Sequence, residues 1–223
     1  YRWWYALFAS GILIHIVLDC ATTYGTQIWL PFSNTRISWG NMAVVDVLFT
    51  MPLALTVPVA AALSRHAALR KVLLIGGLSI SSLYWLYTMH NRNKVDAIWQ
   101  QSLAAKHLPV DRYFAAPTLM NNIVWHGVAV AGDSIYAGDY ALTDRHPEFR
   151  ISGRYAYWRT PPPDLEDSRA WRILTWFSKG YYRWQKEGDG YAFTDLRFGG
   201  IPAGGDDDGV FKFHLVRDHS GAW

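Results

Sequence analysis

Two ionisable side chains lie four residues apart near the end of the first apolar run of the chain. His15 and Asp19 share one face of the predicted helix, because side chains at positions i and i+4 lie one above the other. A third ionisable residue, Asp46, falls inside the next apolar run. Charges inside apolar spans are unfavourable unless they face a polar cavity, a partner or an ion, so these three residues mark a candidate site.

The chemistry of this candidate site would be metal binding. An imidazole and two carboxylates suit zinc, manganese or iron, and such a metal lowers the pKa of a bound water toward neutrality. The four-residue spacing by itself slightly favours a simpler interpretation than metal binding, in which the helix-end His15 is hydrogen-bonded to the neighbouring Asp19. Asp46 favours the metal site instead, because no Lys or Arg lies near it in the sequence and a carboxylate inside an apolar run needs a cation or a proton. We therefore expect His15, Asp19 and Asp46 to hold a divalent metal, most readily zinc.

Three further residues are candidates for catalysis or substrate positioning. Thr23 belongs to a group of hydroxyl residues near the cluster that could orient a substrate, although capping and turn formation are commoner uses. Arg36 could clamp a phosphate or carboxylate with two hydrogen bonds, or rest at the level of the lipid headgroups. His90 would return to the same membrane face as His15, although a basic end of a span is the commoner reading.

Composition divides the 223-residue chain into two different parts. The first 90 residues hold the long uncharged runs, and the remainder carries most of the charged side chains. The formal net charge of +3 is small and dispersed, with no compact basic block, so we expect no nucleic-acid partner. A single cysteine, Cys20, excludes an internal disulfide framework and a zinc ribbon.

Three apolar runs predict about three transmembrane helices, at Trp3–Leu18, Met42–Leu63 and Val72–Met89. The basic residues between the second and third runs place that side in the cytoplasm by the positive-inside tendency. Everything after His90 would then face the periplasm. The chain begins at Tyr1 with no Met and no leader pattern, so we expect it to be the interior of a longer protein.

The second half has the pattern of a mainly antiparallel sheet with one or two helices. Short alternating runs are separated by glycine-rich and acidic turns, which is typical of antiparallel strands. The spacing of apolar residues predicts a surface helix over Lys94–His107 and another over Ser168–Ser178. The strands are expected at Ile123–Val130, Ile135–Leu142, Tyr181–Gln185, Tyr191–Phe198 and Val210–Val216.

The expected fold class is therefore α+β, with a transmembrane helical region at residues 1–93 and a soluble α+β domain at 94–223.

The Asp206–Asp208 run lacks the alternation of a calcium loop, so we interpret it as a solvated turn. Four histidines lack the spacing of ligands and are assigned no role: His126, His146, His214 and His219.

One string of residues resembles a known family. The pattern H-x-x-x-D-x-x-T-T-Y-G-T from His15 to Thr26, followed by Pro31–Ser33 and Arg36, is similar to the YdjM-like family of predicted membrane-bound metal-dependent hydrolases. Similar elements continue through most of the chain, at Pro117–Thr118, Asn121, Tyr136–Asp144, Trp176–Gly180 and Asp195–Gly199.

The resemblance implies a multi-spanning bacterial inner-membrane protein with a metal site. Family members usually carry His-Arg and Thr-His-Ser elements upstream of the point where this chain starts, and those histidines would complete the site. The expected function is hydrolysis of an ester or phosphoester, a lipid among the candidate substrates, in contact with membrane lipid. The alternative is a non-enzymatic membrane protein whose β domain binds a partner or an envelope component.

Overall fold

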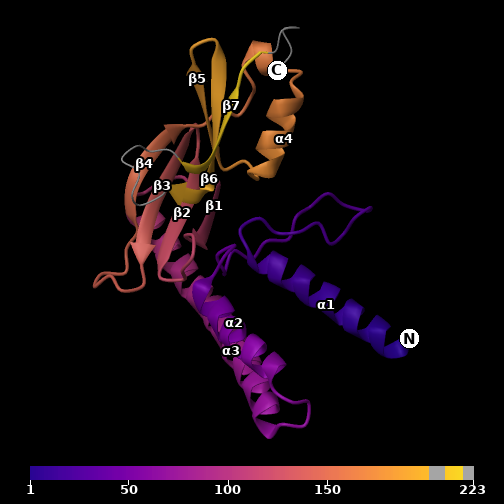
Figure 1. Ribbon diagram of the computed structural model, residues 1–223. Helices are drawn as coiled ribbons and strands as arrows, with labels where there is room; N and C mark the ends of the chain where they lie inside the picture. The colour runs from indigo at the N-terminus through magenta and orange to yellow at the C-terminus, as the bar shows by residue number, and fades with distance from the viewer. Residues whose placement is uncertain (201–208, 218–223) are drawn as a thin grey trace. The chain divides into compact units, whose positions relative to one another are not determined.

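The computed structural model describes residues 1–200 and 209–217. Two compact units make up the chain, one of residues 1–94 with 117–123, the other of residues 95–116 with those from 124 onward (Figure 1). The turn predicted at Asp206–Asp208 and the histidine at position 219 lie outside the described residues. The domain boundary expected after residue 93 stays a prediction. A compact unit is defined by its internal contacts, whereas a domain must also fold on its own.

Two helices in the described residues are long and apolar enough to cross a membrane. The first is α1, Arg2–Ala21, whose 20 residues extend about 30 Å, the thickness of the hydrocarbon core. Its large apolar side chains are exposed around the helix, as expected where lipid replaces water. The second lies within α3, Ala68–Ala105, a single 38-residue helix that joins the predicted third span to the predicted surface helix at 94–107.

The prediction of about three membrane spans is wrong. The helix in the second apolar run, α2, covers only Val47–Ala62. Its 16 residues extend about 24 Å, which is shorter than a span requires. The helix begins late because Asp46, with extended backbone, caps its N-terminus, so the apolar residues from Met42 to Val45 lie outside it.

The helices α2 and α3 pack against each other through small and hydroxyl side chains. A Cβ added at Gly77 would lie 2.1 Å from Thr56 Oγ1, so glycine at this position permits the close approach. One turn further along α3, Ser81 Oγ donates to the carbonyl of Phe49 at 2.8 Å. Such contacts replace the hydrophobic driving force that is missing between helices in lipid.

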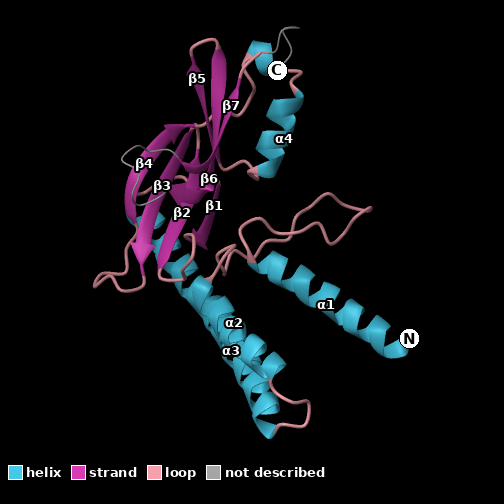
Figure 2. Cartoon of the chain, in the orientation of Figure 1, coloured by secondary structure: helices cyan, strands magenta, loops and turns pink. Residues whose placement is uncertain are grey.

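The second unit contains two antiparallel sheets, which confirms the α+β fold class (Figure 2). In each sheet, neighbouring strands from Val124 onward pair antiparallel, and turns such as Gly132 with φ +57° join them. The first sheet has the order β1 (Arg112–Pro117), β2 (Val124–Ala131), β3 (Ser134–Ala141) and β4 (Arg150–Ala156); the second has β5 (Tyr182–Glu187), β6 (Gly190–Gly200) and β7 (Gly209–Leu215).

Aromatic side chains form the cores of the second unit. Trp99, on the C-terminal part of α3, packs on Phe149 with ring centroids 4.5 Å apart, above Gly127 of β2. The predicted helix at 168–178 is confirmed as α4, Arg169–Phe177, with Ser168 as its N-cap. Trp171 of α4 stacks on Trp184 of the second sheet at 5.0 Å. A short 3-10 helix, Pro163–Leu165, precedes α4.

Candidate functional site

The predicted histidine and aspartate pair forms at the C-terminal end of α1. His15 Nε2 lies 3.4 Å from Asp19 Oδ2, as the i and i+4 spacing requires. The His15 side chain is 76% exposed and that of Asp19 is 45% exposed, so both can reach a further ligand. Imidazole nitrogen and carboxylate oxygen are therefore presented together on one accessible helix face.

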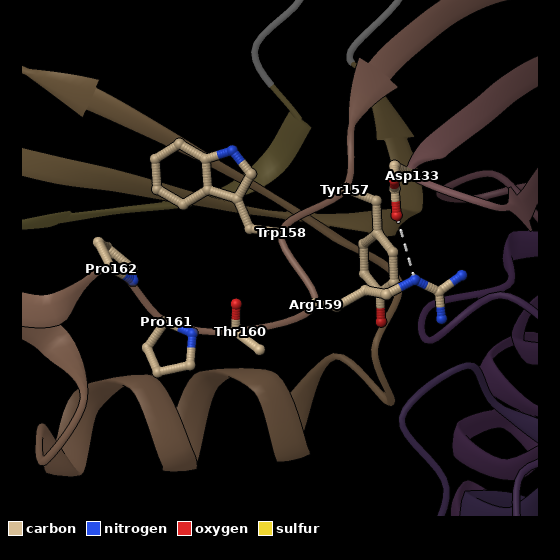
Figure 3. A pocket seen from close by; sticks show the side chains of 7 residues that line it. All are labelled: Asp133, Tyr157, Trp158, Arg159, Thr160, Pro161 and Pro162. Carbon is tan, nitrogen blue, oxygen red and sulfur yellow. Dashed lines mark hydrogen bonds and ion pairs between the residues drawn. The ribbon is translucent and has the colours of Figure 1, made fainter.

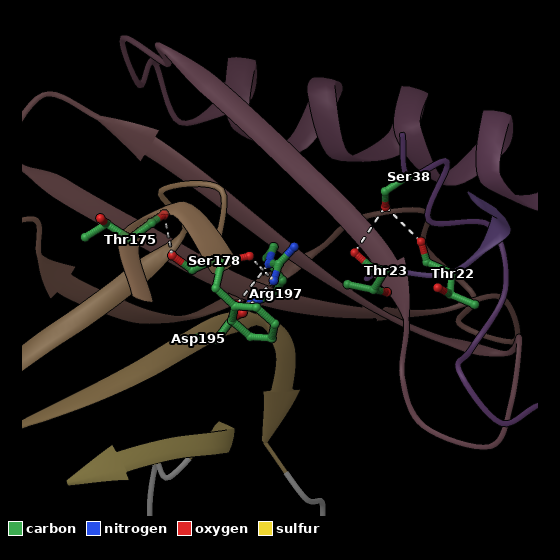
Figure 4. A network of polar contacts seen from close by, with 8 residues as sticks. Thr22, Thr23, Ser38, Thr175, Ser178, Asp195 and Arg197 are labelled. Atoms are coloured by element: carbon green, nitrogen blue, oxygen red, sulfur yellow. Dashed lines mark hydrogen bonds and ion pairs between the residues drawn. The ribbon is translucent and has the colours of Figure 1, made fainter. Parts of the chain in front are cut away.

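A loop folds back on the end of α1, beside this pair. Ser38 Oγ donates to the carbonyls of Thr22 and Thr23, at 2.8 and 3.1 Å (Figure 4). The backbone N–H groups of Trp39 and Asn41 donate to the carbonyls of Cys20 and Ala21. These bonds satisfy the last carbonyls of the helix, which have no partner within it.

Asp46 is held in a different arrangement from the His15 and Asp19 pair. Its Oδ1 accepts from the backbone N–H groups of Leu48 and Phe49, at 3.0 and 3.2 Å. Its Oδ2 accepts from the hydroxyl of Tyr84 on α3 at 3.0 Å, and the residue is 3% exposed. Both carboxylate oxygens are therefore occupied. Metal binding by Asp46 stays a prediction, and it requires that the carboxylate give up one of these bonds.

The other predicted site residues lie on the loop and on α3. Thr23 is buried and its carbonyl is bonded to Ser38, whereas Arg36 is half-buried beside the bridge that pairs Ile37 with Thr26. His90 is exposed on α3. Within residues 1–200 and 209–217, no three His, Cys, Asp or Glu side chains gather as a complete set of metal ligands. The roles expected for Thr23, Arg36 and His90 stay predictions.

A buried amide network in the helical unit was missed at the sequence level. Asn41 Nδ2 donates to Thr88 Oγ1 at 2.9 Å, and the carbonyl of Asn41 accepts from Asn122 Nδ2 at 2.8 Å. Asn91 Nδ2 donates to Asn122 Oδ1 at 2.8 Å. The available signal was a stripe of small and polar residues on one face of α3, spaced alternately by four and three: Gly77, Ser81, Tyr84, Thr88 and Asn91.

The second unit holds a histidine to which the sequence assigned no role. His126 Nδ1 lies 2.7 Å from Asp139 Oδ1, because these residues face each other across β2 and β3. The same unit also buries an ion pair, in which Arg197 Nη2 lies 2.6 Å from Asp195 Oδ2 and both side chains are fully buried (Figure 4). Spacing along the chain could not find the first pair, since its members are 13 residues apart on different strands.

An open pocket of about 410 Å³ lies beside the proline-rich segment of this unit (Figure 3). Trp158 and Arg159 line it, and Arg159 forms ion pairs with Asp111 at 2.8 Å and Asp133 at 3.4 Å. The hydrogen bond to Asp111 is the main reason why the pKa of Arg159 is raised above its ordinary value. The positive charge of Arg159 is therefore balanced by the carboxylates of Asp111 and Asp133.

Comparison with known proteins agrees with the resemblance read from the motifs. Residues 1–95 match the YdjM inner membrane protein family. The match covers the His15 and Asp19 pair, the loop after it and α2, and with the two apolar helices it supports a membrane location. No curated protein and no solved structure matches the chain. The resemblance expected for the motifs after Pro117 stays a prediction.

Proposed function

We propose that this YdjM-like protein is a membrane-bound, metal-dependent hydrolase of an ester or phosphoester substrate. The observation that carries the proposal is the accessible pair of His15 and Asp19, whose donor atoms lie 3.4 Å apart at the end of a helix long enough to span a bilayer. An ionisable pair at such a position is a functional site by default, because it is unfavourable in lipid without a partner.

The donor set of this pair fits a divalent metal in part. Imidazole nitrogen and carboxylate oxygen suit zinc, with manganese and iron as other candidates. A catalytic zinc site ordinarily takes three protein ligands, so at least one more must come from outside the pair. When bound, the metal would supply a water of lowered pKa as the nucleophile.

Several residues of the chain would hold and orient the substrate around this pair. Thr22 Oγ1 donates to the carbonyl of Asp19 at 2.8 Å, which fixes the last turn of α1 and so the direction of the carboxylate. Arg36 would bind a phosphoryl or carboxyl oxygen of the substrate, because a guanidinium donates two parallel hydrogen bonds. The hydroxyl of Thr23 would help to orient the substrate, and the imidazole of His90 would carry a proton to or from it.

The membrane arrangement forms part of the proposal. Arg65 lies between α2 and α3, and Arg70 and Lys71 lie in the first turn of α3. Basic residues at such a connection favour the cytoplasmic side. With that orientation, α3 carries the sheet unit to the periplasmic side. A lipid or phosphoester substrate would then reach His15 and Asp19 at the membrane surface.

The test is hydrolysis of p-nitrophenyl phosphate and p-nitrophenyl butyrate by the full-length protein purified in detergent. We expect turnover that EDTA abolishes and zinc or manganese restores, and a loss of at least a hundredfold in kcat in Asp19→Asn and His15→Ala. Asp189→Asn, in the exposed turn between β5 and β6, and His66→Ala are matched controls that should keep full activity. Turnover that survives both EDTA and Asp19→Asn would exclude the proposal.

A second candidate function is binding without catalysis through the sheet unit. The open pocket beside Trp158 favours it, because aromatic side chains at an accessible pocket provide a surface for a partner or an envelope component (Figure 3). Under this alternative, the hydrolysis assay would give no metal-dependent turnover in the intact protein.

A further inference from the structure

A loop with an apolar tip follows α1, at residues 27–36 (Figure 2). Thr26 and Ile37 close its base as an antiparallel bridge, in which each backbone N–H donates to the carbonyl of the other residue at 2.9 Å. At the tip, Trp29 is 56% exposed, Leu30 is 55% exposed and Phe32 is 93% exposed. The loop therefore presents three large apolar side chains outward instead of burying them in the protein.

Hydrogen bonds within the loop define its shape. The backbone N–H groups of Phe32 and Ser33 donate to the carbonyl of Trp29, at 2.8 and 3.0 Å. Nearer the base, Gln27 Nε2 donates to the carbonyl of Asn34 at 3.2 Å. Backbone groups that bond to each other leave water at a lower cost than those of an open chain, because they keep their partners. The apolar tip is therefore formed without help from a partner.

Two contacts hold the chain just after the loop at the point where α3 changes from apolar to polar. Asn41 Nδ2 donates to Thr88 Oγ1 at 2.9 Å, and the carbonyl of Trp39 accepts from Arg92 Nε at 3.2 Å. Thr88 lies at the end of the uncharged run of α3, and the polar sequence from His90 to Lys94 follows. Such a change within a membrane helix marks the membrane surface. The base of the loop is therefore fixed at the level of that surface.

The composition of the loop matches a lipid partner. Between Cys20 and Val45 the sequence has one charged residue, Arg36, and no acidic residue that would repel anionic headgroups. Tryptophan, present at positions 29 and 39, is enriched at the boundary between membrane and water. Charge and residue type therefore favour a bilayer as the occupant of the exposed apolar tip.

We propose that the tip of loop 27–36 inserts into the lipid bilayer at the boundary between the headgroups and the acyl chains. Leu30 and Phe32 enter the edge of the acyl chains, and Trp29 lies at the headgroup level. Insertion stops at this boundary, because irregular backbone is unstable deeper in the hydrocarbon. This proposal does not depend on the hydrolase proposal, because it requires neither a metal nor a reaction at His15 and Asp19.

The test is spin-label accessibility in the full-length protein, reconstituted into vesicles of phosphatidylcholine and phosphatidylglycerol. In a Cys20→Ala background, which removes the single native cysteine, a nitroxide is attached at Phe32→Cys, and Asp189→Cys in the exposed turn between β5 and β6 is the matched control. Power saturation compares apolar oxygen with a water-soluble nickel complex present on both sides of the membrane. We expect an oxygen-to-nickel ratio about threefold or more above the control, which corresponds to a depth of about 5 to 10 Å.

Each outcome decides the proposal. A label at position 32 that oxygen reaches and nickel does not supports insertion into lipid. A label that nickel reaches as readily as in the Asp189→Cys control overturns it, because the tip then lies in water. Low access to both reagents also overturns it, because the tip is then covered by protein, such as a second copy of the chain. Gel filtration in detergent checks that the variants fold, and Leu30→Cys replaces Phe32→Cys if that variant does not.

Discussion

The hydroxyl of Tyr84 donates a hydrogen bond to Asp46 Oδ2 at 3.0 Å, and so joins the middle of α3 to the N-terminus of α2. The other oxygen of Asp46 caps α2 through two backbone N–H groups. One buried carboxylate thus fixes both the start of a helix and its packing partner.

The first prediction separates these two roles of Asp46. Asp46→Ala should destabilise the helical unit by about 2 to 4 kcal/mol, because it removes the cap and leaves the Tyr84 hydroxyl without an acceptor. Asp46→Asn should have a smaller effect, of about 1 kcal/mol, since the asparagine oxygen still caps the helix and its Nδ2 donates to the Tyr84 oxygen in place of the bond that Tyr84 donates. Unfolding in detergent, followed by circular dichroism, measures both. Equal destabilisation by the two variants would contradict the capping role.

The second prediction concerns the buried amides. Thr88→Val keeps the shape of the side chain but removes the acceptor of Asn41 Nδ2. An unsatisfied buried donor costs about 1 to 3 kcal/mol, so the unfolding midpoint should fall. Ser10→Val is a suitable control, because its hydroxyl bonds only its own helix, at the carbonyl of Leu7, on an exposed face. A shift no larger than that of the control would show that the network adds little stability.

Local patterns predicted most elements of this fold, and their failures have physical causes. The alternating runs and the Ser168 cap identified five strands and α4, because both signals are local. Strands β1 and β4 were missed because alanine, glycine and arginine give their sequences, RYFAAP and RISGRYA, a weak alternation of apolar and polar residues. The second span was predicted too long because apolar composition does not reveal that Asp46 starts the helix at Val47.

The candidate site was predictable only where its residues share one helix. His15 and Asp19 meet because their spacing alone brings them together. The partners of Asp46 and Asn122 lie 38 and 31 residues away, on α3, so tertiary structure decides them.

The third prediction concerns the fully buried ion pair of the second unit. Asp195→Asn should destabilise that unit by about 3 to 5 kcal/mol, because it leaves the Arg197 guanidinium buried without a counter-charge. The double variant Asp195→Leu with Arg197→Met should recover much of the loss, since it removes both charges together. Chemical denaturation of the three proteins measures the difference. A double variant less stable than Asp195→Asn would argue that the pair stabilises beyond its own charges.

The fourth prediction is a loss of stability at alkaline pH. Burial raises the pKa of Tyr181 to about 12, against an ordinary value near 10. Because the folded state keeps the phenol protonated, this contribution is complete below pH 10 and is lost as the pH rises toward 12. Below pH 10, the raised pKa of Tyr181 contributes about 2 to 3 kcal/mol to the free energy of unfolding. Unfolding midpoints between pH 9 and 12 should fall less steeply in Tyr181→Phe, and an identical slope in both proteins would contradict the assignment.

The central claim is that His15 and Asp19 together bind a divalent metal. Metal content of the purified full-length protein, measured by inductively coupled plasma mass spectrometry after exposure to zinc and gel filtration, tests it most directly. The account predicts bound zinc in the unaltered protein and a loss of at least tenfold in Asp19→Asn. Equal zinc in the unaltered protein and Asp19→Asn would contradict it.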